Sequence, residues 1–264
     1  SPTPLFSVIM SDYDISRSSV SLLVSATIIV ITIALLPGGL LIAKIGSKRA
    51  MTLAGFLMSA HLLTPFVDSF LPLVLLRFMF GMGVAITIPA TSAITVDWFK
   101  PNELPLLNGI NESGRALGVS AGVFIAVPIT NIIGWDMTLF SFGIIPLAGA
   151  FIWMIGGRSN ESLANVEPPF SLKDNIPLML NRNTLLLAVG MAGAFAVFIG
   201  FSSWLPTYYN ESRGMTLEKA GSVVAVMPLM GAFLNPVSGL VQSKLARRRP
   251  MLTLSGFMLP IFAL

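Results

Sequence analysis

The sequence is dominated by long apolar stretches, each about as long as a helix that crosses a lipid bilayer. A spanning helix needs roughly 20 mostly apolar residues. Such a chain cannot bury these stretches in a water-soluble globule, so we predict an all-α, polytopic bundle of transmembrane helices. Seven stretches qualify, near residues 19–43, 50–67, 71–96, 105–130, 136–156, 184–206 and 219–242.

Two shorter apolar segments lie at the ends of the sequence. Residues 250–264 are apolar but number only 15, and Leu5 to Met10 is shorter still. Both resemble parts of longer helices. We therefore expect the sequence to be a piece of a larger protein that has most of one helix before it and several helices after it.

Composition excludes several classes of function. Charged residues make up 11% of the chain, against about 25% in soluble domains, so much of the surface must face lipid. The absence of cysteine rules out disulfides, thiol nucleophiles and thiolate metal sites. His61 is the one histidine, and HExxH, GxSxG and P-loop patterns are missing. We predict a protein that is not an enzyme and has no cofactor, no metal and no nucleic-acid partner.

The basic residues are unevenly divided between alternate loops. Of the 16 lysines and arginines, 11 fall in one set of loops, 3 in the other set and 2 inside the apolar stretches. Cytoplasmic loops carry the excess of basic residues in membrane proteins. We therefore predict a multi-pass protein of the plasma or inner membrane whose start lies outside. The richer, cytoplasmic set is Lys44, Lys48, Arg49, Lys100, Arg158, Lys173, Arg182, Lys244, Arg247, Arg248 and Arg249, and the other set is Arg17, Arg213 and Lys219.

A short segment recurs at a spacing of 200 residues. Gly39 to Arg49 and Gly239 to Arg249 share glycine, leucine, lysine and a basic end in register, and each joins two apolar stretches. Two halves of similar topology joined by a cytoplasmic loop are typical of transporters built from parallel repeats. This predicts a first half over 1–156, a linker over 157–183 and an incomplete second half over 184–264.

The repeated segment resembles the signature between helices 2 and 3 of the major facilitator superfamily. Its glycines and basic residues match, but Ala43 and Ser243 replace the acidic residue of the signature. The resemblance implies a loop that latches the two halves in one state. The residues assigned to this conformational switch are Gly39, Lys44, Gly46, Lys48, Arg49, Gly239, Lys244 and Arg248.

Further motifs of the same superfamily follow in order along the chain. Residues 77–83, with Arg77, Gly81 and Gly83, resemble the helix 4 signature, and 97–103 resembles the next loop. Residues 203–209 are similar to a segment of anion and cyanate-type carriers. The resemblance covers helices 2 to 9 of twelve and implies a secondary transporter that works by alternating access.

Glycines within the apolar stretches are candidates for close helix packing. Gly114, Gly118 and Gly122 recur every four residues, so they share one helix face. Small residues on one face let another helix backbone approach. We expect this face, together with Gly81 and Gly83, to pack against neighbouring helices.

Three charged residues lie inside apolar stretches, namely Arg77, Glu112 and Arg115. Each costs about 2.5–3.5 kcal/mol at the bilayer centre and normally faces the bundle interior or a watery cavity. Glu112 and Arg115 are three residues apart and can pair on one helix face. Two interpretations stay open: a buried structural ion pair, or a site that binds substrate and the coupling ion.

Aromatic residues near the end of the sixth stretch have two interpretations as well. Trp204 and Tyr208 fit an interfacial aromatic belt, or they line the path of the substrate. We keep both as candidates for the substrate path.

The leading functional hypothesis is a secondary active transporter that moves a small solute, driven by an ion gradient with the proton as the expected coupling ion. Two arginines against one glutamate favour an anion. The alternatives are a drug or metabolite exporter of the same superfamily and, from another class, a non-transporting membrane sensor. We expect a monomer in the lipid bilayer.

Overall fold

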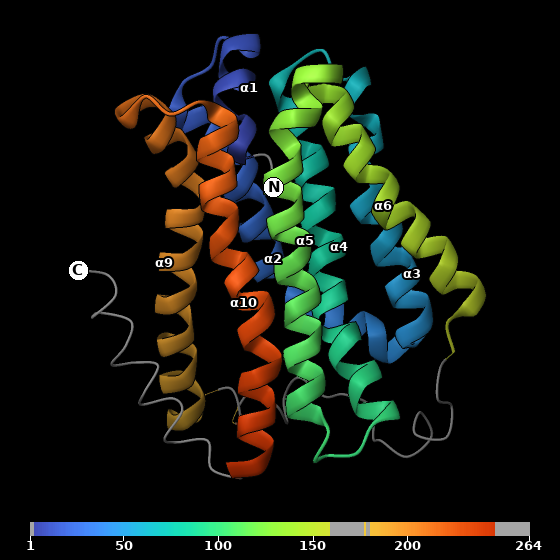
Figure 1. Cartoon of the computed structure of the whole chain (residues 1–264). Coiled ribbons are helices and arrows are strands. Elements are labelled where there is room, and N and C mark those ends of the chain that lie inside the picture. The colour runs from blue at the N-terminus through green and yellow to red at the C-terminus, as the bar shows by residue number, and fades with distance from the viewer. Residues whose placement is uncertain (1–2, 159–176, 178–179, 246–264) are drawn as a thin grey trace.

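The structure is a computed structural model that describes residues 3–158, 177 and 180–245, and no strand occurs among them. Its helices confirm the all-α fold (Figure 1). In chain order they are η1 (Thr3–Leu5), α1 (Phe6–Tyr13), α2 (Arg17–Ile45), α3 (Ser47–Met58), η2 (Ser59–Phe66), α4 (Phe70–Trp98), α5 (Leu104–Ile133), α6 (Trp135–Gly156), α9 (Arg182–Arg213) and α10 (Leu217–Leu245).

Each of the seven predicted stretches is helical. Among the described residues, six helices are long and apolar enough to cross a membrane, namely α2, α4, α5, α6, α9 and α10. The stretch predicted at 50–67 is instead divided between α3 and the 3-10 helix η2. Pro65 lies in η2 and lacks the backbone N–H that an α-helical turn would use. The predicted stretch 250–264 lies outside the described residues.

Glycines with positive φ make two of the tight turns between helices. Gly46 has φ +81° between α2 and α3, and Gly134 has φ +87° between α5 and α6. This backbone region is costly for residues that carry a Cβ. Each glycine therefore lets the chain reverse within a single residue, so consecutive helices lie beside each other.

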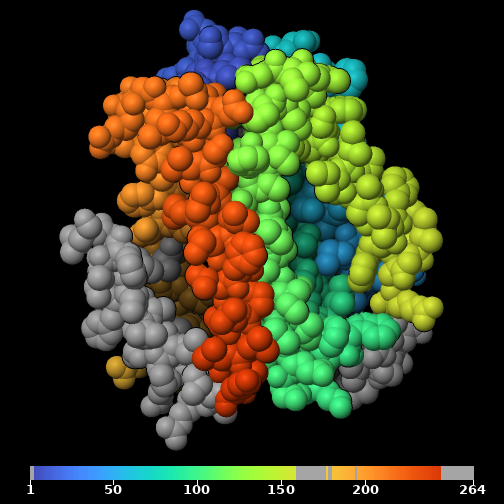
Figure 2. Space-filling model, viewed as in Figure 1, coloured from blue at the N-terminus to red at the C-terminus, as the bar shows by residue number. Residues whose placement is uncertain are grey.

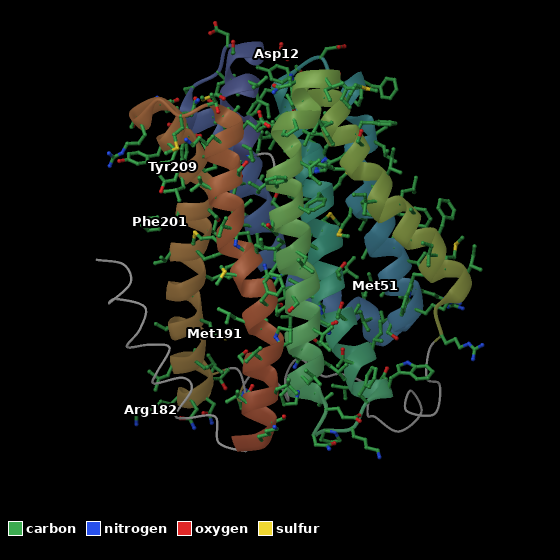
Figure 3. All side chains as sticks on the ribbon, in the orientation of Figure 1. Asp12, Met51, Arg182, Met191, Phe201 and Tyr209 are labelled. Carbon is green, nitrogen blue, oxygen red and sulfur yellow. The ribbon has the colours of Figure 1, made fainter. Side chains whose placement is uncertain are left out.

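The helices run side by side and alternate in direction (Figure 1). Asp12 and Tyr209 lie toward one end of the bundle, and Met51 and Arg182 lie toward the other (Figure 3). The second end is the one for which the excess of basic residues predicts the cytoplasm. The division into two halves stays a prediction, although α6 ends at Gly156 and α9 begins at Arg182, which brackets the expected linker.

Large apolar side chains cover the outside of the bundle. Ile132 and Ile155 are 82% and 81% exposed, and many other leucines, isoleucines and phenylalanines are exposed as well. Water would make such a surface very costly, whereas hydrocarbon would not. The exposed apolar surface therefore fits a chain surrounded by lipid.

The first helices pack closely through glycines of α4. A methyl group on Gly81 would lie 3.0 Å from the carbonyl oxygen of Thr27 in α2. One on Gly83 would lie 2.6 Å from the carbonyl oxygen of Ala54 in α3. Both glycines thus lie where backbones approach each other.

Helix α10 packs along α5 for most of its length (Figure 2). A methyl group on Gly109 would lie 2.6 Å from the carbonyl oxygen of Asn235, and one on Gly239 would lie 2.5 Å from that of Pro105. The hydroxyls of Ser113 and Ser120 donate to carbonyl oxygens of α10 at 2.6 and 2.7 Å. Small and hydroxylated residues therefore hold these two helices together.

The described helices do not pack on Gly114, Gly118 and Gly122, so the predicted packing of these three glycines stays a prediction. No atom of the described residues lies within 4 Å of a methyl group placed on any of the three. Gly118 follows Gly109 by nine residues, about two and a half turns, so it points to the opposite side of α5. The close approach uses the stripe Gly109, Ser113, Ala116, Ser120, Val123 and Val127 instead.

Candidate functional site: a cavity between α5, α9 and α10

A cavity of about 330 Å³ lies between α5 of the predicted first half and the two described helices of the second half, α9 and α10. Its volume is within the range of small-molecule sites. It is lined by Arg115, Ala116 and Val119 of α5, by Met191, Phe195 and Phe198 of α9, and by Met227, Pro228, Gly231 and Asn235 of α10.

The cavity lies near the middle of all three helices. Arg115 is 11 residues from the start of α5, which is about 16 Å along the axis at 1.5 Å per residue. Gly231 is close to the midpoint of α10, and Phe198 is close to that of α9. A site at mid-depth between two repeats is where secondary transporters bind their solutes.

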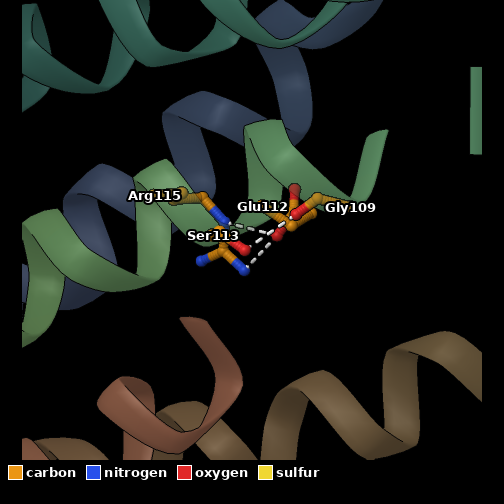
Figure 4. Close-up of polar contacts among 4 residues, drawn as sticks. All are labelled: Gly109, Glu112, Ser113 and Arg115. Carbon is orange, nitrogen blue, oxygen red and sulfur yellow. Dashed lines mark hydrogen bonds and ion pairs between the residues drawn. The ribbon is translucent and has the colours of Figure 1, made fainter. Parts of the chain in front are cut away.

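Glu112 and Arg115 form an ion pair on α5 (Figure 4). The Nε and Nη2 atoms of Arg115 donate to the same oxygen of Glu112 at 2.7 and 2.5 Å. The side chain of Arg115 is 50% exposed and that of Glu112 is 53% exposed. Both groups are accessible among the described residues, and Arg115 reaches the cavity wall, so the interpretations as a structural pair and as a binding site both stay predictions.

The rest of the cavity wall is almost entirely apolar. Among its lining residues, Arg115 is the charged one and Asn235 is the other with a polar side chain. Sequence reasoning missed Asn235, Phe195 and Met191, because each is an ordinary residue of an apolar stretch and belongs to no motif. Only the packing of α5 against the later helices α9 and α10 brings these residues together with Arg115.

Arg77 lies elsewhere, inside the predicted first half. It is 5% exposed, and its guanidinium lies 5.9 Å from the centre of the Phe80 ring, on which the ring of His61 stacks at 5.1 Å. The Nε and Nη2 atoms of Arg77 and both ring nitrogens of His61 have no hydrogen-bond partner among the described residues. Arg77 does not line the cavity, so its role in substrate binding or proton coupling stays a prediction.

Trp204 and Tyr208 lie near the outer end of α9, away from the cavity lining. Trp204 meets Phe6 edge to face at 5.8 Å, and Tyr208 lies beside Tyr209. Near them, Arg17 of α2 and Glu211 of α9 form an ion pair of 2.5 Å. At this end the beginning of the chain thus contacts α9, and a role of the two aromatic residues in the substrate path stays a prediction.

The predicted switch residues lie in α2, α3 and α10, toward the end of the bundle that is predicted to face the cytoplasm. Lys44 and Lys244 lie in the last turns of α2 and α10, Lys48 and Arg49 begin α3, and Arg248 lies outside the described residues. The two matched glycines differ: no described atom lies within 4 Å of a methyl group on Gly39, whereas Gly239 packs on α5. These contacts do not test the switching role of these residues, which stays a prediction.

No cluster of three or more histidine, cysteine, aspartate or glutamate side chains suited to a metal occurs in the described part of the chain. The fold and the cavity together define a polytopic helical membrane protein with a solute-sized site between helices of its two predicted halves. The chain belongs to the Major Facilitator Superfamily, whose profile matches residues 1–264. This membership confirms the resemblance, the fold class and the expectation that the chain is not an enzyme.

Several curated relatives are transporters named for anionic solutes. The probable galactarate/D-glucarate transporter GudP of Escherichia coli is 27% identical over 253 residues, which cover 83% of this chain and 56% of the relative. The probable nitrate transporter NarT of Staphylococcus haemolyticus is 28% identical, covering 92% of this chain and 62% of the relative. The D-galactonate transporter of Escherichia coli is 23% identical, with 91% and 62% covered. The chain thus spans about six-tenths of the length of these relatives.

Proposed function

We propose that the protein is a secondary active transporter that carries a small anion by alternating access and binds it in the cavity between α5, α9 and α10. The observation that supports this most is the exposed guanidinium of Arg115 in the wall of that cavity. A fixed cation in an apolar wall attracts an anion more strongly than it would in water. The relatives named for galactarate, nitrate and galactonate support the same class of solute.

Glu112 supplies the proposed link to a proton gradient. Its carboxylate already holds two nitrogens of Arg115, so an anion that binds this guanidinium competes with Glu112. Once displaced, the carboxylate has lost its counter-charge and takes up a proton more readily. Anion and proton would then cross the membrane together, so the pair Glu112–Arg115 would couple the two in symport.

These observations give less support to two other functions. An exporter of neutral or cationic drugs would leave Arg115 facing its substrate with no matching charge. A membrane sensor that does not transport would not need a solute-sized cavity between the halves, and the turns that join the described helices are short apart from the connection between α6 and α9.

The experiment that tests the proposal is anion binding and uptake by the protein expressed from its full gene. In proteoliposomes, labelled anions should accumulate when the outside is acidified. Arg115→Gln should lose anion binding by about a hundredfold, because hydrogen bonds to charged groups contribute roughly 1.5–3 kcal/mol.

Arg17→Gln is the matched control for this substitution. It breaks an arginine–glutamate pair of the same 2.5 Å length in which Arg17 is 65% exposed, but far from the cavity lining. Its anion affinity should equal that of the unchanged protein. Equal affinity of the Arg115→Gln protein would refute the proposed binding site.

A further inference from the structure

The cavity wall combines one charge with a large apolar surface, and this combination restricts the solute further than its sign does. Besides Arg115, the described lining offers one polar side chain, Asn235. The other side chains are Met191, Phe195, Phe198, Met227, Pro228, Val119 and Ala116, with Gly231 between them. A solute that fills this space touches hydrocarbon, sulfur and aromatic faces nearly everywhere.

A polyhydroxylated sugar acid suits this wall poorly. Each hydroxyl that leaves water and finds no partner weakens binding, and sites built for hydroxyls hold matching polar groups. One amide, that of Asn235, cannot satisfy several hydroxyls and a second carboxylate as well. A small inorganic anion such as nitrate fits no better, because it has no apolar part that could contact the rings of Phe195 and Phe198.

We infer that the solute is an organic monocarboxylate with an apolar, aromatic body. This rests on the proposed function, since it places the carboxylate on Arg115. The Arg115 fork binds one carboxylate, and the amide of Asn235 donates to it or to a single further oxygen. The rings of Phe195 and Phe198 and the thioethers of Met191 and Met227 surround the body, with the edge-to-face and sulfur–aromatic contacts that such groups favour.

The probe is phenylacetate, with D-glucarate and nitrate as the competing classes. Affinity is measured by titration calorimetry on the purified protein expressed from its full gene, which avoids leakage of the weak acid through lipid. Phenylacetate should bind at least about tenfold more tightly than D-glucarate or nitrate. Tighter binding of either of the other two anions overturns the inference.

Two phenylalanines of α9 provide a matched pair of variants. Phe195 lines the cavity and is 53% exposed, whereas Phe201 does not line it and is 56% exposed. Phe195→Ala should lower the affinity for phenylacetate by about tenfold, the size expected for an aromatic contact together with its buried area. Phe201→Ala should leave the affinity unchanged. Met191→Gln, a change of similar length on the same wall, provides a second readout if Phe195→Ala does not fold.

The outcomes separate this inference from the proposed function. If D-glucarate or nitrate binds more tightly than phenylacetate and Arg115→Gln abolishes that binding, the anion site stands and the aromatic solute is wrong. If phenylacetate binds but neither Phe195→Ala nor Met191→Gln weakens it, the assignment of the apolar wall is wrong. If no anion depends on Arg115, both proposals fail.

Discussion

Two faces of helix α5 have different surroundings, although both carry small residues at regular spacing. One face holds Gly109, Ser113 and Ser120 and contacts α10 through a glycine–carbonyl contact and two hydroxyl bonds. The other regions of its surface carry the exposed pair Glu112–Arg115 and three glycines that touch no described neighbour. The difference teaches that small residues mark a helix interface only where a partner backbone is present. Changes on the face that packs on α10, which holds Gly109, Ser113 and Ser120, should alter stability. Changes on the cavity face, which carries Glu112 and Arg115, should alter binding.

The largest effect is expected at Gly109, where the backbones of α5 and α10 lie close together. Gly109→Val would place a branched side chain against the carbonyl of Asn235, 2.6 Å from the first added carbon. Overpacking of this kind costs about 1–3 kcal/mol and sometimes more. The melting temperature of the purified protein should fall clearly. Gly118→Val is the control on the opposite side of the helix, and an equal fall in both variants would contradict the division into two faces.

Ser113 should show a smaller loss on the same face. Its hydroxyl donates to the carbonyl oxygen of Ala232 in α10 at 2.6 Å. Interhelical hydrogen bonds in membrane proteins average about 0.6 kcal/mol. Ser113→Ala should therefore lower the unfolding free energy by about that amount. Ser141→Ala, which removes only a bond to the preceding turn of α6, should cost less, and the reverse order would count against an interface held by hydroxyls.

Glu112 tests the cavity face, where function rather than stability should respond. An exposed pair three residues apart on a helix contributes only about 0.3–0.5 kcal/mol, so Glu112→Gln should melt close to the unchanged protein. Anion exchange should persist in proteoliposomes, while uptake driven by an acid outside should disappear. Proton-driven accumulation that survives in this variant would show that Glu112 is not the coupling group.

The smallest effect is expected at Gly118. A methyl group there meets no described atom within 4 Å, and alanine favours a helix over glycine by about 1 kcal/mol at most. Gly118→Ala should therefore leave the melting temperature unchanged or slightly raised. A marked fall, measured beside the unchanged protein, would mean that this face does pack against another segment.

Much of the fold could be predicted from the sequence because bilayer thickness sets the length of a spanning helix. The seven apolar stretches match the observed helices, even where Pro65 turns the end of one into a 3-10 segment. The pairing of Glu112 with Arg115 also followed from their spacing, since residues three apart on a helix are neighbours. These are local properties, and a single helix is enough to determine them.

The surroundings of each helix depended on partners that the sequence does not reveal. Whether Arg77 or Arg115 reaches the cavity, and whether Gly109 or Gly118 meets α10, is set by how each helix is rotated against its neighbours. In lipid an apolar side chain gains little by facing another helix rather than hydrocarbon, so hydrophobicity does not report that rotation. The sequence by itself therefore determined which segments are helices and which charges lie among them. Only the tertiary structure decided which side chains meet Arg115 across the cavity, because those contacts join residues more than 70 positions apart.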